Sequence, residues 1–162
     1  MKQLLLLRHG RAVPHEDGYD WDRELRRSGV DDATAAGRLL AAYQIDLAVV
    51  SNAVRAAQTW QLACNAGASA TRTNLVDWLY GVSGTELTRH VAQLSDALHT
   101  VIFVGHEPGL SHAITHLAAP EEETWPASEG LPTSSFVVLS HQGRWSTMAG
   151  QAKFERYEYV RA

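Results

Sequence analysis

The sequence is short of several features, and each shortage excludes a class of protein. Among its 162 residues there is a single cysteine, Cys64, so no internal disulfide can form and a reducing compartment is expected. The opening apolar run, Leu4 to Leu7, has four residues, whereas a membrane-spanning helix needs about 20. The same run is too short, and is followed too soon by Arg8, for a signal peptide. We therefore expect a cytoplasmic protein without a membrane partner.

Basic charge is scarce as well. Lysine and arginine total 14 against 18 acidic residues, which gives a formal net charge of -4, and no run of basic residues offsets this balance. A nucleic-acid partner is therefore not expected, because binding to a phosphate backbone needs clustered positive charge. The sequence also lacks internal repeats and low-complexity segments. Its length suits one compact domain, which we expect to span residues 1–162.

What the sequence does contain is a series of short apolar runs that end in polar residues. The runs are Leu4–Leu7, Ile45–Val50 and Val101–Val104, and they are typical of strands buried on both faces of a parallel sheet. Amphipathic stretches follow each run, so the pattern predicts an α/β fold with a mostly parallel sheet. In such sheets ligands bind outside the carboxyl ends of the strands.

Turn and capping residues bound the remaining elements. Helices are expected at Gly29–Tyr43 after a Ser28 cap, at Ala53–Ala66 before Gly67, from Ser83 to Leu98, and at Leu110–Leu117. Strands are expected at Thr71–Leu75 and Ser135–Ser140, with a hairpin turn at His141–Arg144 leading into Trp145–Met148. The tail, Ala149–Ala162, carries no clear pattern.

Side chains that can bind phosphate follow the three apolar runs. Arg8 and His9 end the first run, Arg55 lies in the first turn of the helix after the second, and His106 follows the third. A guanidinium grips phosphate oxygens as a planar fork, and an imidazole can attack phosphorus. An arginine at a helix amino end opposes the helix dipole, which makes sense if an anion is bound there. Each residue alone could be an accident, but their equivalent positions favour a phosphate site.

The motifs together resemble those of a known family. They are Leu7-Arg8-His9-Gly10, then Ser51-Asn52-x-x-Arg55-Ala56-x-Gln58-Thr59, then Val104-Gly105-His106. This ordered set is similar to the histidine phosphatase superfamily, whose fold is called phosphoglycerate mutase-like. Asp20-x-x-Arg23-x-Leu25, Leu79-Tyr80 and Leu131-Pro132-Thr133-Ser134 resemble its SixA branch of phosphohistidine phosphatases. The resemblance implies a three-layer α/β/α sandwich.

The resemblance also implies a role for each residue of the phosphate site. His9 would be the nucleophile that becomes transiently phosphorylated, and Arg8, Arg55 and His106 would form the phosphate pocket. Phosphoryl transfer needs an in-line nucleophile and positive charge around the equatorial oxygens. Two arginines supply that charge, so neither a metal nor another cofactor is expected. His9 must be unprotonated on its attacking nitrogen, with the other nitrogen donating to a backbone carbonyl.

Two departures from the larger relatives bear on the substrate. Many of those relatives use a carboxylic acid as proton donor, and here Asp20, Asp77 and Glu86 are candidates without a clear motif match. An alkoxide leaving group needs such a donor, whereas an imidazole, whose conjugate acid has a pKa of about 6.5, departs with less help. The chain also has no room for the helical cap that encloses small substrates in larger relatives. Both departures favour a phosphohistidine on another protein.

Several hypotheses remain open at this point. The leading one is a SixA-like phosphatase acting on a histidine-phosphorylated carrier or phosphotransfer protein. The alternatives are a broad phosphatase for small phosphomonoesters and a catalytically silent phosphate-binding module. His112 and His116 have the spacing of a two-histidine metal site, but no third ligand stands nearby. We expect them to be an ordinary helix-face pair.

Overall fold

The computed structural model describes residues 1–15, 18–121 and 129–162. Its described part contains a six-stranded sheet in the order β3-β2-β4-β1-β5-β6. The strands are β1 (Lys2–Arg8), β2 (Ile45–Ser51), β3 (Ala70–Val76), β4 (Thr100–Gly105), β5 (Phe136–His141) and β6 (Lys153–Glu158). Pairs among β3, β2, β4 and β1 are parallel, whereas β5 lies antiparallel to both β1 and β6. The predicted mostly parallel sheet is confirmed.

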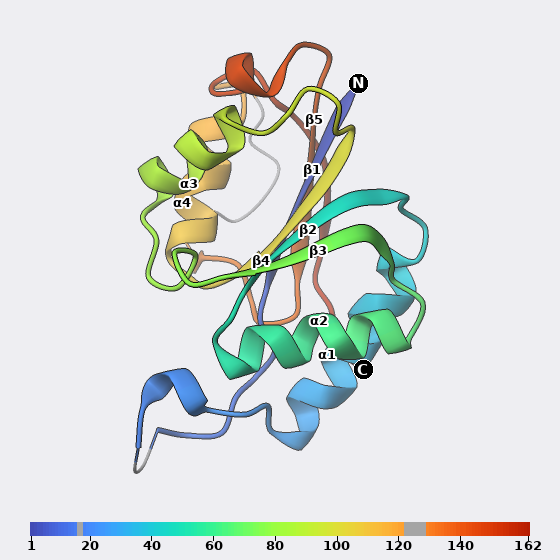
Figure 1. Ribbon diagram of the computed structural model, residues 1–162, viewed down its shortest axis with the longest axis vertical. Helices are drawn as coiled ribbons and strands as arrows, with labels where there is room; N and C mark the ends of the chain where they lie inside the picture. Colours follow the sequence, from blue (N-terminus) through green and yellow to red (C-terminus); the bar gives the residue numbers. More distant parts are fainter. Residues whose placement is uncertain (16–17, 122–128) are drawn as a thin grey trace.

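Helices cover both faces of this sheet, as Figure 1 shows. Helices α1 (Arg27–Leu40) and α2 (Val54–Asn65) lie on one face, and α3 (Gly84–Ala92) and α4 (Gly109–Leu117) on the other. The 3₁₀ helices η1 (Asp20–Asp22) and η3 (Trp145–Thr147) lie in the connections. The fold is therefore the expected three-layer α/β/α sandwich. No helix within the described ranges is long and apolar enough to cross a membrane.

The central strand β1 explains the four-leucine run. Leu4 and Leu6 pack into the core cluster under α3 and α4, whereas Leu5 and Leu7 pack into the cluster under α1 and α2. All four are fully buried, and each such side chain contributes about 2 kcal/mol of transfer free energy. The alternation of side chains along a strand sends successive leucines to opposite faces. A strand between two helical layers therefore has to be apolar at every position.

Helices α1 and α3 differ most from the sequence-based expectation, and α1 ends at Leu40 rather than at Tyr43. Helix α1 begins at Arg27 rather than Gly29, with Arg26 as its N-cap and no side-chain capping bond, so Ser28 is not the cap. The N–H of the N-cap residue Arg26 donates to the Arg11 carbonyl (3.0 Å), and this bond sets the residue at which the helix starts. Helix α3 has the predicted Ser83 cap but ends at Ala92, not at Leu98.

Local bonds explain the early end of α3. The Ser95 hydroxyl accepts the N–H of Ala97, a side-chain interaction that competes with helix continuation. The carbonyl of Leu98 accepts from both Lys2 Nζ (2.8 Å) and Trp145 Nε1 (3.0 Å). Leu98 still packs against the core, but it does so from the connection after α3 and not from a longer helix.

The strand predicted at Trp145–Met148 is wrong. These residues form η3 and its C-cap, and the strand that pairs with β5 is β6, within the tail that showed no clear pattern. Trp145 is fully buried and its indole N–H bonds across the molecule to Leu98. Burying that ring requires the chain to turn inward, so the next strand along the chain, β6, starts only at Lys153.

Candidate active site

Three adjacent strands bring the predicted phosphate-binding residues together. In the sheet order β2, β4 and β1 are neighbours, and their carboxyl ends lead into Arg55, His106 and Arg8-His9 respectively. The imidazole rings of His9 and His106 have centroids 5.1 Å apart. All four residues therefore lie at one edge of the sheet, as the sequence predicts.

His9 is fixed in one tautomer by its surroundings. It is 9 % exposed, and its Nδ1 lies 2.8 Å from the carbonyl oxygen of Gly10. Because a carbonyl can only accept a hydrogen bond, Nδ1 carries the proton and Nε2 keeps its lone pair. Burial lowers the pKa of His9 to about 3, and the positive charges of Arg8 and Arg55 act in the same direction. A neutral ring with a free Nε2 can act as a nucleophile.

The two arginines are each held by hydrogen bonds from their terminal Nη atoms. Arg8 donates from Nη1 to the carbonyl of Leu131 (3.0 Å). Arg55, which is 6 % exposed, donates from Nη1 to the Asp20 carbonyl (2.8 Å) and from Nη2 to the Asp20 carboxylate (3.0 Å). The Nε of each arginine is buried and has no hydrogen-bond partner within the described residues. Each guanidinium thus keeps an unsatisfied Nε donor for an oxyanion.

His106 completes this set. Its Nε2 lies 2.8 Å from the hydroxyl of Ser51, the first residue of the motif that contains Arg55. Burial, with a further contribution from Arg55, lowers the pKa of His106 to about 4, so its ring is neutral at physiological pH. Its Nδ1 is buried without a partner in the described part of the chain.

The turn after β1 holds His9 in place. The Gly10 N–H donates to the hydroxyl of Thr59 (2.8 Å), and that hydroxyl donates to the carbonyl of Arg55 (2.7 Å). On the other side, the Ser134 N–H is shared between the carbonyls of Arg8 and His9 (3.1 Å each). Ser134 has a φ of 58°, a strained conformation for a residue other than glycine. Strain of this kind is often found at functional sites.

Unsatisfied buried polar atoms gather around this turn. In the described ranges five buried side-chain atoms have no hydrogen-bond partner, and they belong to Arg8, Asn52, Arg55, His106 and Ser134. Buried polar atoms are normally paired, so each exception needs an explanation. The two arginine Nε atoms are donors, and His106 Nδ1 and the Ser134 hydroxyl can each donate or accept. The fifth atom, Oδ1 of Asn52, can only accept. A bound oxyanion would satisfy these donors.

Asp20 is brought to the site, but in a form that is poor for proton donation. Its carboxylate accepts from the Tyr80 hydroxyl (2.5 Å) and pairs with Arg23 (2.9 Å) and Arg55 (3.0 Å). The hydrogen bonds from Tyr80 and Arg23, with the charge of Arg55, hold the pKa of Asp20 well below its usual range. A general acid needs a pKa near the working pH. Asp20 is therefore suited to orient Arg55 rather than to protonate a leaving group.

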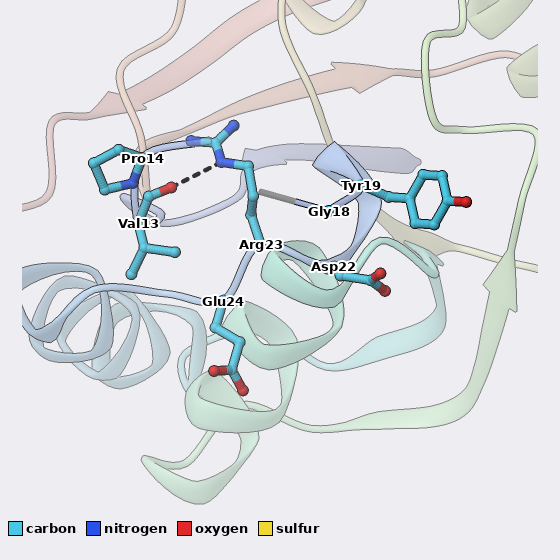
Figure 2. Close-up of a pocket in the computed structure, with 7 residues that line it drawn as sticks. All are labelled: Val13, Pro14, Gly18, Tyr19, Asp22, Arg23 and Glu24. Carbon is cyan, nitrogen blue, oxygen red and sulfur yellow. Dashed lines mark hydrogen bonds between the residues drawn. The ribbon is translucent and has the colours of Figure 1, made fainter. Parts of the chain in front are cut away.

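The loop that carries Asp20 is tied down beside a cavity. Figure 2 shows the Arg23 side chain reaching from Nε to the Val13 carbonyl (2.8 Å). The cavity there has a volume of about 470 Å³ and is lined by Val13, Pro14, Gly18, Tyr19, Asp22, Arg23 and Glu24. Arg23 thus binds both the Val13 carbonyl and the Asp20 carboxylate, and it links these two positions of the loop. The spacing Asp20-x-x-Arg23 therefore corresponds to an ion pair, and the Asp20 carboxylate of this pair also binds Arg55 in the site.

Comparison with known proteins identifies the family. A model described as "Histidine phosphatase superfamily (branch 1)" matches residues 4–93. The chain belongs to the histidine phosphatase superfamily. An uncharacterized protein of Mycobacterium tuberculosis is 31 % identical over 147 residues, which cover 86 % of this chain and 90 % of that protein. Membership of the superfamily fits phosphatase activity.

Solved structures support the same membership. A candidate phosphohistidine phosphatase SixA from Nakamurella multipartitia is 30 % identical, with a TM-score of 0.84 over 99 % of this chain and 97 % of that one. The protein histidine phosphatase SixA complexed with tungstate is 20 % identical, with a TM-score of 0.79 and coverage of 96 % and 95 %. Phosphatases with other names share the fold as well. The comparisons therefore establish a phosphatase, and they leave its substrate open.

The other carboxylates suggested by the sequence lie outside the site of this phosphatase. Asp77 and Glu86 are exposed, and within the described residues no hydrogen bond or ion pair joins either side chain to the two arginines or the two histidines. His112 and His116 are exposed on α4, and no group of three or more metal-binding side chains occurs in the described ranges. Among the described contacts, none joins Asp77, Glu86, His112 or His116 to His9.

Glu107 is a residue of the site that the sequence analysis missed, and Tyr80 is one that it named in the Leu79-Tyr80 motif without a role. The Glu107 carboxylate accepts from Ser111 N–H (2.9 Å), Leu131 N–H (3.0 Å) and the Ser111 hydroxyl. Since the Leu131 carbonyl binds Arg8, Glu107 supports Arg8 through one residue of backbone. The Tyr80 ring meets His106 edge-on, with centroids 5.3 Å apart. Glu107 follows His106 directly but belongs to no short motif with an evident mechanism, and the Leu79-Tyr80 resemblance assigned no contact to Tyr80.

Proposed function

We propose that this phosphatase removes phosphate from a histidine on a carrier or phosphotransfer protein, through a phosphohistidine intermediate on His9. One observation carries the proposal: both carboxylates found beside the arginines, Asp20 and Glu107, act as hydrogen-bond acceptors in the described structure. Neither carboxylate donates a proton in these hydrogen bonds. A substrate whose leaving group needs little protonation suits such a site.

The chemistry of the leaving group makes this distinction. An alcohol is a very weak acid, so an alkoxide departs slowly unless a general acid protonates it. The conjugate acid of imidazole has a pKa of about 6.5, so imidazole is a far better leaving group. When the other ring nitrogen of the phosphohistidine carries a proton, the leaving imidazole is neutral. The P–N bond of phosphohistidine is therefore cleavable without a carboxylic acid.

We infer a mechanism in two displacements. In the first, Nε2 of His9 attacks phosphorus, the bond from phosphorus to the substrate nitrogen breaks, and its electron pair stays on the leaving imidazole. In the second, water attacks the phosphorus on His9, the bond from phosphorus to Nε2 breaks and its electron pair returns to Nε2. The two protons of the water leave with orthophosphate, and neutral His9 is regenerated. Arg8 and Arg55 stabilise the charge on the equatorial oxygens, and His106 donates a hydrogen bond to the same group. Neutral His9, with Nδ1 bound to Gly10, is ready for the first step.

The surroundings of the site suit a protein substrate. At the carboxyl edge of the sheet, the connections after β2, β3 and β4 are short, namely residues 52–53, 77–83 and 106–108, whereas the longer connection after β1 carries Asp20. The outer residues Asp20 and Tyr80 are more than a third exposed. Because these outer side chains are open to solvent, a histidine side chain on another folded protein can reach them. We also propose a cytoplasmic location, which fits a chain with one cysteine.

The proposal is tested by phosphate release from a histidine-phosphorylated carrier protein and from a small phosphomonoester. The wild type and His9→Ala are compared on both. We expect rapid release from the carrier, slow release from the ester, and neither in His9→Ala. Preference for the ester would instead support a broad phosphomonoester phosphatase. Binding of phosphate without release from either compound would support a catalytically silent module.

A further inference from the structure

The leaving group must depart toward solvent in this site. The nucleophile His9 is 9 % exposed, so it lies on the floor of the site, whereas Tyr80 is 37 % exposed. In-line displacement requires the leaving group to stand opposite the attacking nitrogen. With the attacking Nε2 on the floor, the leaving group stands on the side where Tyr80 is exposed.

An aromatic pair occupies this outer side. The Tyr80 ring lies edge-on to His106, and the Trp21 ring packs against Tyr80 at a centroid distance of 5.0 Å and an angle of 72°. The guanidinium carbon of Arg55 lies 5.7 Å from the centre of the Tyr80 ring. Tyr80 therefore touches two of the four phosphate-site residues.

Contacts on several sides fix the position of the Tyr80 ring. Its hydroxyl donates to the Asp20 carboxylate (2.5 Å), which ties the connection after β3 to η1. Trp21, His106 and Arg55 contact the ring itself. An exposed tyrosine would normally move freely, whereas this one is held in place with part of its ring open to solvent. A fixed, open aromatic ring is a suitable contact surface for a planar group.

We propose that Tyr80 is a specificity-determining residue that packs against the imidazole leaving group of the substrate. The inference rests on the proposed function, since it assigns a contact to the leaving group of a phosphohistidine. Transfer to His9 breaks the P–N bond and leaves the electron pair on the imidazole, whose ring then leaves along Tyr80. Aromatic pairs are favoured over ring–aliphatic contacts, so the contact discriminates between leaving groups by about 3- to 10-fold.

The hydroxyl and the ring of Tyr80 have separate tasks and can be separated by substitution. Tyr80→Phe keeps the ring and loses the bond to Asp20, whereas Tyr80→Leu loses both. Tyr43 supplies a matched control, because it is a partly buried tyrosine packed against the core before β2, at the opposite end of that strand. Tyr43→Leu removes an aromatic ring from the protein without altering the site.

The experiment compares two substrates that differ only in the leaving group. One peptide sequence is prepared with phosphohistidine or with phospholysine at the same position, so that both have a P–N bond and one lacks a ring. The measured quantity is the ratio of kcat/KM for phosphohistidine to kcat/KM for phospholysine. We expect Tyr80→Leu to lower this ratio by about 3- to 10-fold, and Tyr80→Phe and Tyr43→Leu to keep the wild-type ratio.

Each other outcome is decisive. An unchanged ratio in Tyr80→Leu would overturn the proposed contact, and an equal fall in Tyr80→Phe would assign the effect to the hydroxyl and not to the ring. Failure of the wild type to cleave the phosphohistidine peptide would also refute the contact. Failure of the wild type on a histidine-phosphorylated carrier protein is a different result, because it would refute the proposed function itself.

Discussion

Acid should destabilise this protein through His9 in particular. Burial lowers the pKa of His9 in the folded protein to about 3, whereas an unfolded chain has a histidine pKa of about 6.5. Between these values the unfolded state binds a proton that the folded state does not. The stability that comes from a neutral His9 is therefore fully present above pH 6.5, and it is lost as the pH falls toward 3.

The size of the effect follows from this difference. At pH 5 the histidine of the unfolded chain is almost fully protonated while folded His9 is still neutral. The free energy of unfolding should therefore fall by about 2 kcal/mol between pH 7 and pH 5 because of His9 alone. His9→Asn removes the titrating group and keeps a polar side chain in the turn. The variant should lose about 2 kcal/mol less than the wild type over the same interval.

Urea unfolding followed by tryptophan fluorescence at pH 7 and pH 5 measures this difference, since the chain has five tryptophans. His116→Asn is the matched control, because His116 is exposed on α4, and this variant should follow the wild type. His106 titrates in the same direction, with a folded pKa of about 4, so part of the acid sensitivity persists in His9→Asn. Equal losses in the wild type and His9→Asn would refute the argument that His9 is kept neutral by burial.

Three further predictions concern the residues around the phosphate. Asp20→Asn should lower kcat/KM by roughly tenfold, because Arg55 loses a charged hydrogen-bond partner, and steady-state kinetics will measure the loss. Glu107→Gln should weaken inhibition by orthophosphate several-fold, since one of the acceptors that hold Leu131 against Arg8 becomes a donor; inhibition constants are the measurement. Phosphate release should continue undiminished in EDTA, because two arginines supply the positive charge that phosphoryl transfer needs.

Controls for these predictions come from exposed carboxylates. Glu86→Gln on α3 and Glu121→Gln beyond α4 both change an exposed side chain and should behave as the wild type in the same assays. A wild-type kcat/KM in Asp20→Asn would mean that Arg55 is oriented without Asp20. Orthophosphate inhibition that is unaltered in Glu107→Gln would separate Glu107 from Arg8, and loss of turnover in EDTA would require a metal ion in the reaction.

The strands that build the site could be predicted because their environment is uniform. β1, β2 and β4 lie between two helical layers, so almost every position is apolar and the strand ends where polarity returns. The residues at these ends are then fixed by topology, since neighbouring parallel strands end at the same edge. Arg8, His9 and His106 followed from that reasoning and from the family resemblance.

The elements that were missed depend on long-range contacts. Trp145 turns the chain inward because its ring fills the core and its N–H reaches Leu98, a contact that no local pattern reveals. The same holds for Tyr80, whose hydroxyl meets Asp20 across 60 residues of sequence. Glu107 acts through the backbone of Leu131, which lies 24 residues away. Side chains that act through tertiary partners have no spacing rule from which to predict them.

The most direct test of the central claim is to trap the phosphorylated enzyme. The wild type and His9→Ala are mixed with a histidine-phosphorylated carrier protein, quenched rapidly under alkaline conditions that preserve phosphohistidine, and digested for mass spectrometry. The account predicts a phosphoryl group on the peptide that contains His9 in the wild type, and none on the variant. Carrier dephosphorylation with no phosphoryl group on His9 at any quench time, or undiminished dephosphorylation by His9→Ala, would contradict it.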